Sequence, residues 1–114
     1  MTTVPKGREG TIIEVWVNCP DEQTAETIAD AIVGERLAAC ANIYPPISSR
    51  YHWKGKIESA SEVPLLLKTR QSLFDKLVER VTMLHPYETP SIVGIDVTFA
   101  NAPYQAWLID ETDR

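Results

Sequence analysis

The chain has 114 residues, a formal net charge of −5 at pH 7 and a pI near 4.9. This length predicts one domain, and an acidic balance without a cluster of Lys or Arg argues against a nucleic-acid-binding surface. The sequence has no long apolar run, no signal peptide and no lipidation motif, so we expect no membrane contact and a cytoplasmic protein. Cys19 and Cys40 are the two thiols, which fits a reducing compartment, with a disulfide between them as an open alternative.

The first third of the chain predicts a strand followed by a helix. Residues 1–10 lack apolar periodicity and are expected to form a flexible leader, so that residues 11–114 make up the single domain. Residues 11–18 alternate with the two-residue period of a strand. Asp21 is a good N-cap for the helix that follows, and Gly34 is its expected C-terminal cap.

The middle of the chain predicts a long hairpin. Residues 38–53 favour extended structure, and the Pro-Pro pair within them must bend the strand or restrict it to an edge. The Lys-Gly-Lys sequence at 54–56 is typical of a hairpin turn. Residues 57–69 then alternate as a returning strand, in which Pro64 predicts a bulge or an edge position.

The last third predicts a helix, a strand and a terminal helix. Residues 72–75 resemble a capping box, and an apolar stripe follows them to residue 84, so this helix should end at His85. Residues 92–99 alternate as a strand, and residues 103–109 predict a short C-terminal helix. The order strand, helix, two strands, helix, strand is that of a split β-α-β fold.

This order predicts an α+β protein with a ferredoxin-like β-α-β-β-α-β plan. A four-stranded antiparallel sheet should carry both longer helices on one face, with the short C-terminal helix after them. The other face then lies uncovered, although it combines Glu14, Lys68 and Asp96 with large apolar side chains. The apolar side chains that we assign to this second face are Ile12, Trp16, Leu66 and Ile92.

Such an apolar face favours an oligomer over a monomer, because a patch of this kind is poorly suited to water. Tyr51 and Trp53 lie on one side of the long hairpin, as aromatic anchors of an interface often do. Packing of these two side chains within the chain is the alternative. A closed symmetric assembly is the expected form of the oligomer.

The segment His85-Pro86-Tyr87-Glu88-Thr89-Pro90 marks the predicted site. Its two prolines fix two φ angles and bias the residue before each away from helical geometry, so the segment reads as a rigid connector. His85 is therefore held at a helix C-terminus, where its ring can cap the helix, take a proton or offer a nitrogen to a metal or substrate. Tyr87 and Glu88 are expected to shape a cleft beside it.

Six segments stand in one order along the chain: Cys19-Pro20-Asp21, Cys40-Ala41-Asn42-Ile43, Tyr51-His52-Trp53-Lys54-Gly55-Lys56, Glu62-Val63, His85-Pro86-Tyr87-Glu88-Thr89-Pro90 and Trp107-Leu108. Together they resemble the CutA family of divalent-cation-tolerance proteins, and the resemblance covers about residues 11–110. It implies a ferredoxin-like subunit assembled as a homotrimer with the sheets turned inward. It also implies a role in tolerance to copper and other divalent metals without a catalysed reaction.

A metal site is implied by the same resemblance. It suggests Cys19 and His85 as ligands of copper or another divalent cation, although Leu84 stands where the family has the first of two histidines. The start of a helix beside Cys19 could favour its thiolate. Glu62 is a candidate third ligand, and Cys40 is expected to be a core residue. Because tight sites use roughly three or four protein ligands, we expect weak binding.

Three classes of function follow from these residues. The leading one is a non-catalytic metal-responsive homotrimer. The second is a small-ligand or protein-partner signalling adaptor that uses clefts between subunits, lined by Tyr87 or Trp53. The third, a thiol enzyme with Cys19 as nucleophile and His85 as base, ranks last because the sequence has no oxyanion motif and no glycine-rich nucleotide loop.

Overall fold

The structure is a computed structural model that describes residues 11–112, and the predicted leader lies outside these residues. The described part is an α+β fold, with a short 3-10 turn, Gln71–Leu73, before the second helix. The elements in chain order are β1 (Ile12–Cys19), α1 (Glu22–Gly34), β2 (Cys40–Ile43), β3 (Ile47–Trp53), β4 (Lys56–Arg70), α2 (Phe74–Leu84), β5 (Ile92–Asp96) and α3 (Ala102–Glu111).

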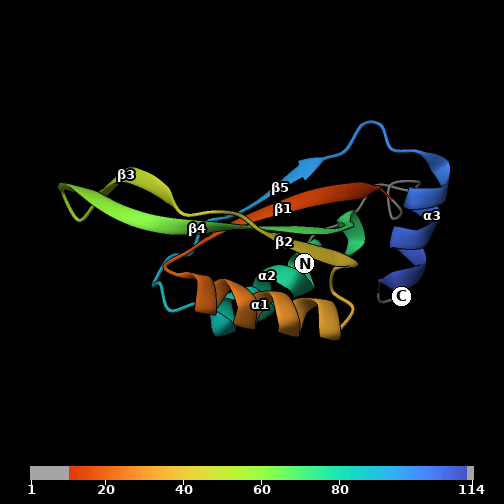
Figure 1. The fold of residues 1–114 in the computed structure, drawn as a ribbon, viewed down its shortest axis with the longest axis horizontal. Helices are drawn as coiled ribbons and strands as arrows, with labels where there is room; N and C mark the ends of the chain where they lie inside the picture. The colour runs from red at the N-terminus through yellow and green to blue at the C-terminus, as the bar shows by residue number, and fades with distance from the viewer. Residues whose placement is uncertain (1–10, 113–114) are drawn as a thin grey trace.

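Strand β4 is the longest strand and the one to which most others pair. Its sheet has the order β2-β4-β1-β5, all antiparallel, and β3 pairs with the first half of β4. This order is compatible with the predicted ferredoxin-like plan. The segment expected as one bent strand is two strands, because the Pro-Pro pair at 45–46 interrupts the pairing between Ile43 and Ile47. The β3–β4 hairpin projects from one end of the molecule (Figure 1).

Pro64 lies inside β4 and faces the interruption between β2 and β3. The register with β4 shifts there by one residue, which agrees with the predicted bulge or local edge position. Pro64 stands opposite Asn18 in unbroken register with β1, and on its other side its carbonyl accepts a hydrogen bond from the Tyr44 N–H at 2.9 Å. In an antiparallel ladder the N–H and C=O of one residue point to the same side. The missing N–H of Pro64 therefore faces the interruption between β2 and β3, where a ladder bond is not required.

Helices α1 and α2 lie side by side under one face of the sheet, as predicted (Figure 1). The Asp21 carboxylate accepts a hydrogen bond from the Thr24 N–H at 2.8 Å, which confirms this residue as the N-cap of α1. No helix within residues 11–112 combines the length and apolar character needed to cross a bilayer. The fully buried side chains between the helices and the sheet include Val15, Val17, Ile28, Ile32, Leu65, Leu67, Leu77 and Val81.

Two predicted helix caps are wrong. Gly34 is the last helical residue, and the left-handed position that ends α1 is Arg36, with φ of 60° and its N–H bonded to the Val33 carbonyl at 3.0 Å. The capping box expected at 72–75 does not form. Instead, α2 continues from the 3-10 turn, and its N-cap Leu73 makes no side-chain capping bond.

The second face of the sheet is partly covered within the single chain, because α3 packs against it at the end opposite the hairpin (Figure 1). The Tyr104 hydroxyl lies 3.6 Å from Cys40 Sγ, and the Lys68 ammonium lies 5.8 Å from the Tyr104 ring centre. Cys40 is half-buried rather than a core residue. Ile12 and Leu66, expected to need a partner, are already buried.

The register of β5 corrects the predicted composition of this face. Val17 pairs with Ile92 and Trp16 pairs with Val93, so Ile92 faces the helices and packs against the core. Val93 and Ile95 are the β5 side chains on the second face, and each exposes about half of its surface. Asp96, which pairs with Ile13, also belongs to the helix side, and β5 ends there instead of at residue 99.

Candidate functional site

His85 joins the end of α2 to the end of β1. Its N–H bonds to the Val81 carbonyl, and its extended backbone, with ψ of 135°, is the geometry expected before Pro86. The ring does not cap the helix. His85 Nε2 lies 2.8 Å from the Asn18 carbonyl oxygen, and the Tyr87 N–H donates to Nδ1 at 3.2 Å.

These two bonds determine the tautomer of His85. Because Nδ1 accepts a hydrogen bond, the proton of the ring must lie on Nε2, which donates it to Asn18. The side chain is 6% exposed and its ring centre lies 4.6 Å from that of Tyr87. Both nitrogens are thus engaged, and a metal or substrate must displace one of these bonds to reach the ring.

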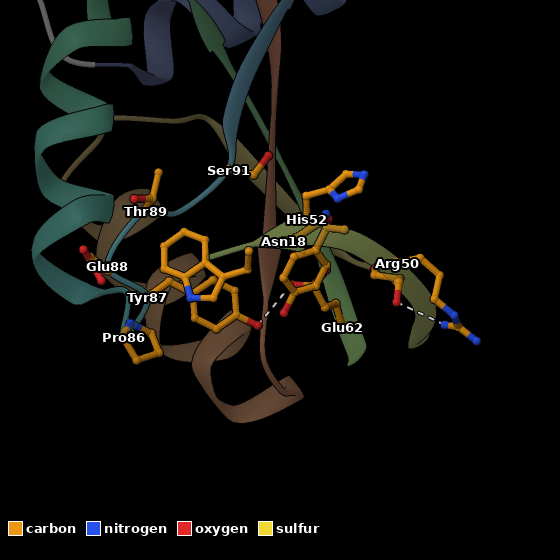
Figure 2. A pocket seen from close by; sticks show the side chains of 12 residues that line it. Asn18, Arg50, His52, Glu62, Pro86, Tyr87, Glu88, Thr89 and Ser91 are labelled. Carbon is orange, nitrogen blue, oxygen red and sulfur yellow. Dashed lines mark hydrogen bonds between the residues drawn. The ribbon is translucent and has the colours of Figure 1, made fainter. Parts of the chain in front are cut away.

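Glu62 and Tyr87 meet beside this histidine. Glu62 lies in β4, is 5% exposed and accepts a hydrogen bond from the Tyr87 hydroxyl at 3.0 Å, which Figure 2 draws as a dashed line. Burial, reinforced by this bond, raises the pKa of Tyr87 to about 12. Tyr87 therefore remains a hydrogen-bond donor to Glu62 at physiological pH.

Cys19 ends β1 with its side chain in the core, facing the helices. Burial, followed by the negative charges of Asp21 and Glu62, raises the pKa of its thiol to about 11. The expectation that the start of α1 favours the thiolate is therefore wrong, because desolvation and two carboxylates outweigh the helix dipole. Both Cys19 and Cys40 are free thiols, so the disulfide alternative is not realised.

The predicted metal ligands Cys19, Glu62 and His85 lie at one end of the sheet but do not form a ready metal centre in one chain. Within residues 11–112, no group of three or more His, Cys, Asp or Glu side chains is arranged to hold a metal ion. The thiol holds its proton, the imidazole nitrogens are engaged and the carboxylate accepts the Tyr87 hydroxyl. The three residues thus do not fit a metal without rearrangement or additional ligands.

A cleft of about 660 Å³ opens between the β3–β4 hairpin and the segment after α2 (Figure 2). It includes the residues predicted for a cleft, Tyr51, Trp53, Tyr87 and Glu88, together with Glu62. Pro86 and Thr89 also line it and belong to the segment predicted as the site. The lining residues that sequence reasoning did not assign to it are Asn18, Ser49, Arg50, His52 and Ser91. No sequence signal distinguishes most of these, since they reach the cleft only through the pairing of β3 with β4 and of β1 with β4.

The fold and the site define a small α+β protein with a ligand-sized cleft and no metal centre assembled within residues 11–112. The sequence model of one family, described as CutA1 divalent ion tolerance protein, matches residues 13–111. The chain therefore belongs to the CutA family of divalent-cation tolerance proteins, which confirms the predicted resemblance.

Relatives support this assignment over most of the chain. Protein CutA from Mus musculus is 44% identical over 104 residues, which cover 91% of this chain and 59% of the relative. The divalent-cation tolerance protein CutA from Thermus thermophilus is 46% identical over 98 residues, covering 86% of this chain and 95% of that protein. A solved structure of the divalent cation tolerance protein from Thermus thermophilus superposes with a TM-score of 0.87 at 44% identity, covering 90% of this chain and 99% of that one.

The chain thus spans less than two thirds of the length of some relatives, including the mouse protein. Two relatives carry a compartment in their names. Protein CutA, chloroplastic, from Arabidopsis thaliana is 42% identical over 100 residues, covering 88% of this chain and 55% of that protein. The solved structure of the periplasmic divalent cation tolerance protein CutA from Archaeoglobus fulgidus is 32% identical and superposes with a TM-score of 0.86. The match covers 90% of this chain and 99% of that one.

Proposed function

We propose that this protein acts in divalent-cation tolerance as a non-catalytic cytoplasmic homotrimer that binds copper or another divalent cation weakly. The observation that carries the proposal is the family match over residues 13–111, together with the position of Cys19, Glu62 and His85 at one end of the sheet. The cytoplasm is proposed from the two free thiols, whereas the named chloroplastic and periplasmic relatives indicate that compartment varies in the family.

The homotrimer is supported by apolar surface at the edge of the sheet and on the hairpin. Val93 and Ile95 lie on edge strand β5, each about half exposed, and Ile57 near the hairpin turn is 70% exposed. Side chains of this size are expected to be buried between subunits when they gather on one surface. Light scattering tests this: a trimer of 12.8 kDa chains has a mass of about 38 kDa, and a 12.8 kDa species contradicts the proposal.

Weak metal binding follows from the chemistry of Cys19. A thiol must lose its proton before it ligates a metal, and a pKa of about 11 instead of 9.0 makes this step about a hundredfold less favourable at neutral pH. Residues 11–112 of one chain supply only two or three ligands at this place, so additional ligands from a second subunit or water would complete the site. We expect affinity to rise with pH.

The metal proposal has matched controls because the chain has two cysteines and two histidines. Copper and zinc are titrated calorimetrically into the parent protein and into four variants. Cys19→Ser and His85→Ala should weaken binding about tenfold or more, since each removes one ligand. Cys40→Ser and His52→Ala should bind as the parent does. Equal binding by Cys19→Ser, His85→Ala and the parent contradicts the site.

The absence of catalysis is proposed from the state of the same two residues. At a pKa of about 11, only about one Cys19 thiol in ten thousand is ionised at pH 7, and the buried side chain has no open approach. His85 accepts at Nδ1 from Tyr87 and donates from Nε2 to Asn18, so it has no free nitrogen to act as base. Iodoacetamide should therefore alkylate Cys40 much faster than Cys19, and rapid modification of Cys19 contradicts this view.

A second candidate function is a small-ligand or protein-partner adaptor. The cleft favours it, since its volume of about 660 Å³ falls within the range of small-molecule sites and it combines aromatic walls with a few polar groups. In this case metal tolerance is an indirect consequence of ligand or partner binding.

A further inference from the structure

Glu62 is a buried carboxylate whose charge is not offset by a cation of the described chain. It is 5% exposed, and the Tyr87 hydroxyl, a neutral donor, bonds to its Oε2. No ion pair within residues 11–112 includes it. A buried carboxylate is costly without a counter-charge, and it can accept more hydrogen bonds than the one that Tyr87 supplies. Glu62 also lines the cleft, so a ligand in the cleft can supply the missing positive charge and hydrogen bonds.

Aromatic side chains form much of the wall around this carboxylate. Tyr51, Trp53 and Tyr87 all line the cleft, and the first two are 39% and 37% exposed, so their rings are accessible. The face of an aromatic ring attracts an ammonium group. The chain illustrates this itself, because the Lys54 ammonium lies 5.6 Å from the centre of the Trp53 ring.

The remaining charges leave the base of the cleft negative. Among residues 11–112, Arg50 is the one Lys or Arg that lines the cleft. Its guanidinium extends away from Tyr87 and Glu62 (Figure 2) and donates to the Ser48 hydroxyl and the Ser49 carbonyl. Lys54 is 3.9 Å from Glu88 at the exposed rim. Neither cation neutralises Glu62.

We propose that this cleft binds a small organic cation, a protonated or quaternary amine, with its nitrogen beside Glu62 and its alkyl groups against Tyr51, Trp53 and Tyr87. An alkylated ammonium group is attracted both by a carboxylate and by the faces of aromatic rings, and this cleft has both. The proposal names the ligand class for the adaptor function above and rests on that function. It shares Glu62 with the proposed metal site, whereas Trp53 belongs to the cleft alone.

The test uses choline as the probe and dimethylbutanol, its neutral analogue in which carbon replaces the quaternary nitrogen, as the control ligand. Calorimetry is carried out on the full chain with a chelator present. Choline should bind at least about tenfold more tightly than the alcohol, because only choline has the charge that Glu62 and the rings attract.

Matched variants locate the site. Trp53→Leu should weaken choline binding about tenfold, whereas Trp107→Leu, which alters a similarly exposed tryptophan outside the cleft, should leave it unchanged. Glu62→Gln keeps the shape of the side chain and should weaken binding by a similar factor, with Glu58→Gln in the same strand as its control. Circular dichroism verifies that each variant is folded.

Each other outcome overturns the proposal. No detectable heat with choline, including the case in which a second copy of the chain fills the cleft, means that the cleft is not an ammonium site. If choline and dimethylbutanol bind equally well, the charge of the ligand has no role. If Trp53→Leu and Trp107→Leu lose the same affinity for choline, the ligand does not bind in this cleft. A copper titration of Trp53→Leu separates the two functions, since it should match that of the parent protein even if choline does not bind.

Discussion

Alkaline pH should destabilise the folded chain through the Cys19 thiol. Burial, Asp21 and Glu62 raise the pKa of this thiol from 9.0 to about 11 in the folded state. The folded chain therefore holds the proton more tightly than the unfolded chain does. This contribution is fully present below pH 9 and is lost as the pH rises through 11, which amounts to about 3 kcal/mol of the free energy of unfolding.

Urea unfolding under reducing conditions measures this loss at several pH values between about 8 and 11, at one protein concentration. Cys19→Ala removes the titrating group, and its packing cost is the same at every pH. Because the folded thiol is only half ionised at pH 11, the variant should lose about 2 kcal/mol less than the parent over this range. Cys40→Ala should behave as the parent does. The pKa values of Tyr87 and Tyr104 are also raised, to about 12 each, so both groups lower the free energy of unfolding at alkaline pH in all three proteins. If Cys19→Ala loses as much stability as the parent, the reasoning is refuted.

Three substitutions test individual contacts by urea unfolding. Tyr87→Phe should cost about 1–3 kcal/mol, because it removes the hydroxyl bonded to the buried Glu62 carboxylate, and a change below about 0.5 kcal/mol contradicts that bond's importance. Leu77→Ala should cost about 2–5 kcal/mol, since Leu77 is fully buried between α2 and the sheet. Gly94→Ala should destabilise by about 1–3 kcal/mol, because the new methyl group meets the Phe74 ring at 3.1 Å, and a neutral result means that this ring shifts freely.

Local sequence patterns were sufficient for one helix cap and for the order of the elements, apart from the division of residues 38–53 into β2 and β3. Asp21 caps α1 through a contact three residues away, and the β1 and α2 periodicities are visible in the chain itself. The predicted caps at Gly34 and at 72–75 were wrong because several backbone geometries can satisfy the free groups at a helix end. Here α1 ends with Arg36 in the left-handed region, and α2 begins from a 3-10 turn. The prediction that Ile92 lies on the second face of the sheet was wrong. The pairing of β5 with β1, and not the alternation within β5, decides which side is buried.

The site shows the same division between local and tertiary information. The segment from His85 to Pro90 was predicted from its prolines, and the cleft does lie against it. The ionisation of Cys19 was predicted in the wrong direction, since the sequence reveals the nearby helix start but not the burial or the approach of Glu62 from β4. The partners of His85 and Tyr87 are likewise invisible in the sequence, because Asn18 and Glu62 lie 67 and 25 residues away along the chain.

The sequence by itself determined the α+β class, the family and the segment beside which a cleft forms, because periodicity, turn chemistry and motif order are properties of neighbouring residues. Only the tertiary structure decided which side chains face that cleft and which protons they hold. Strand register places Glu62 next to Tyr87 and buries Cys19, and both hydrogen bonding and desolvation depend on distances that sequence separation does not specify.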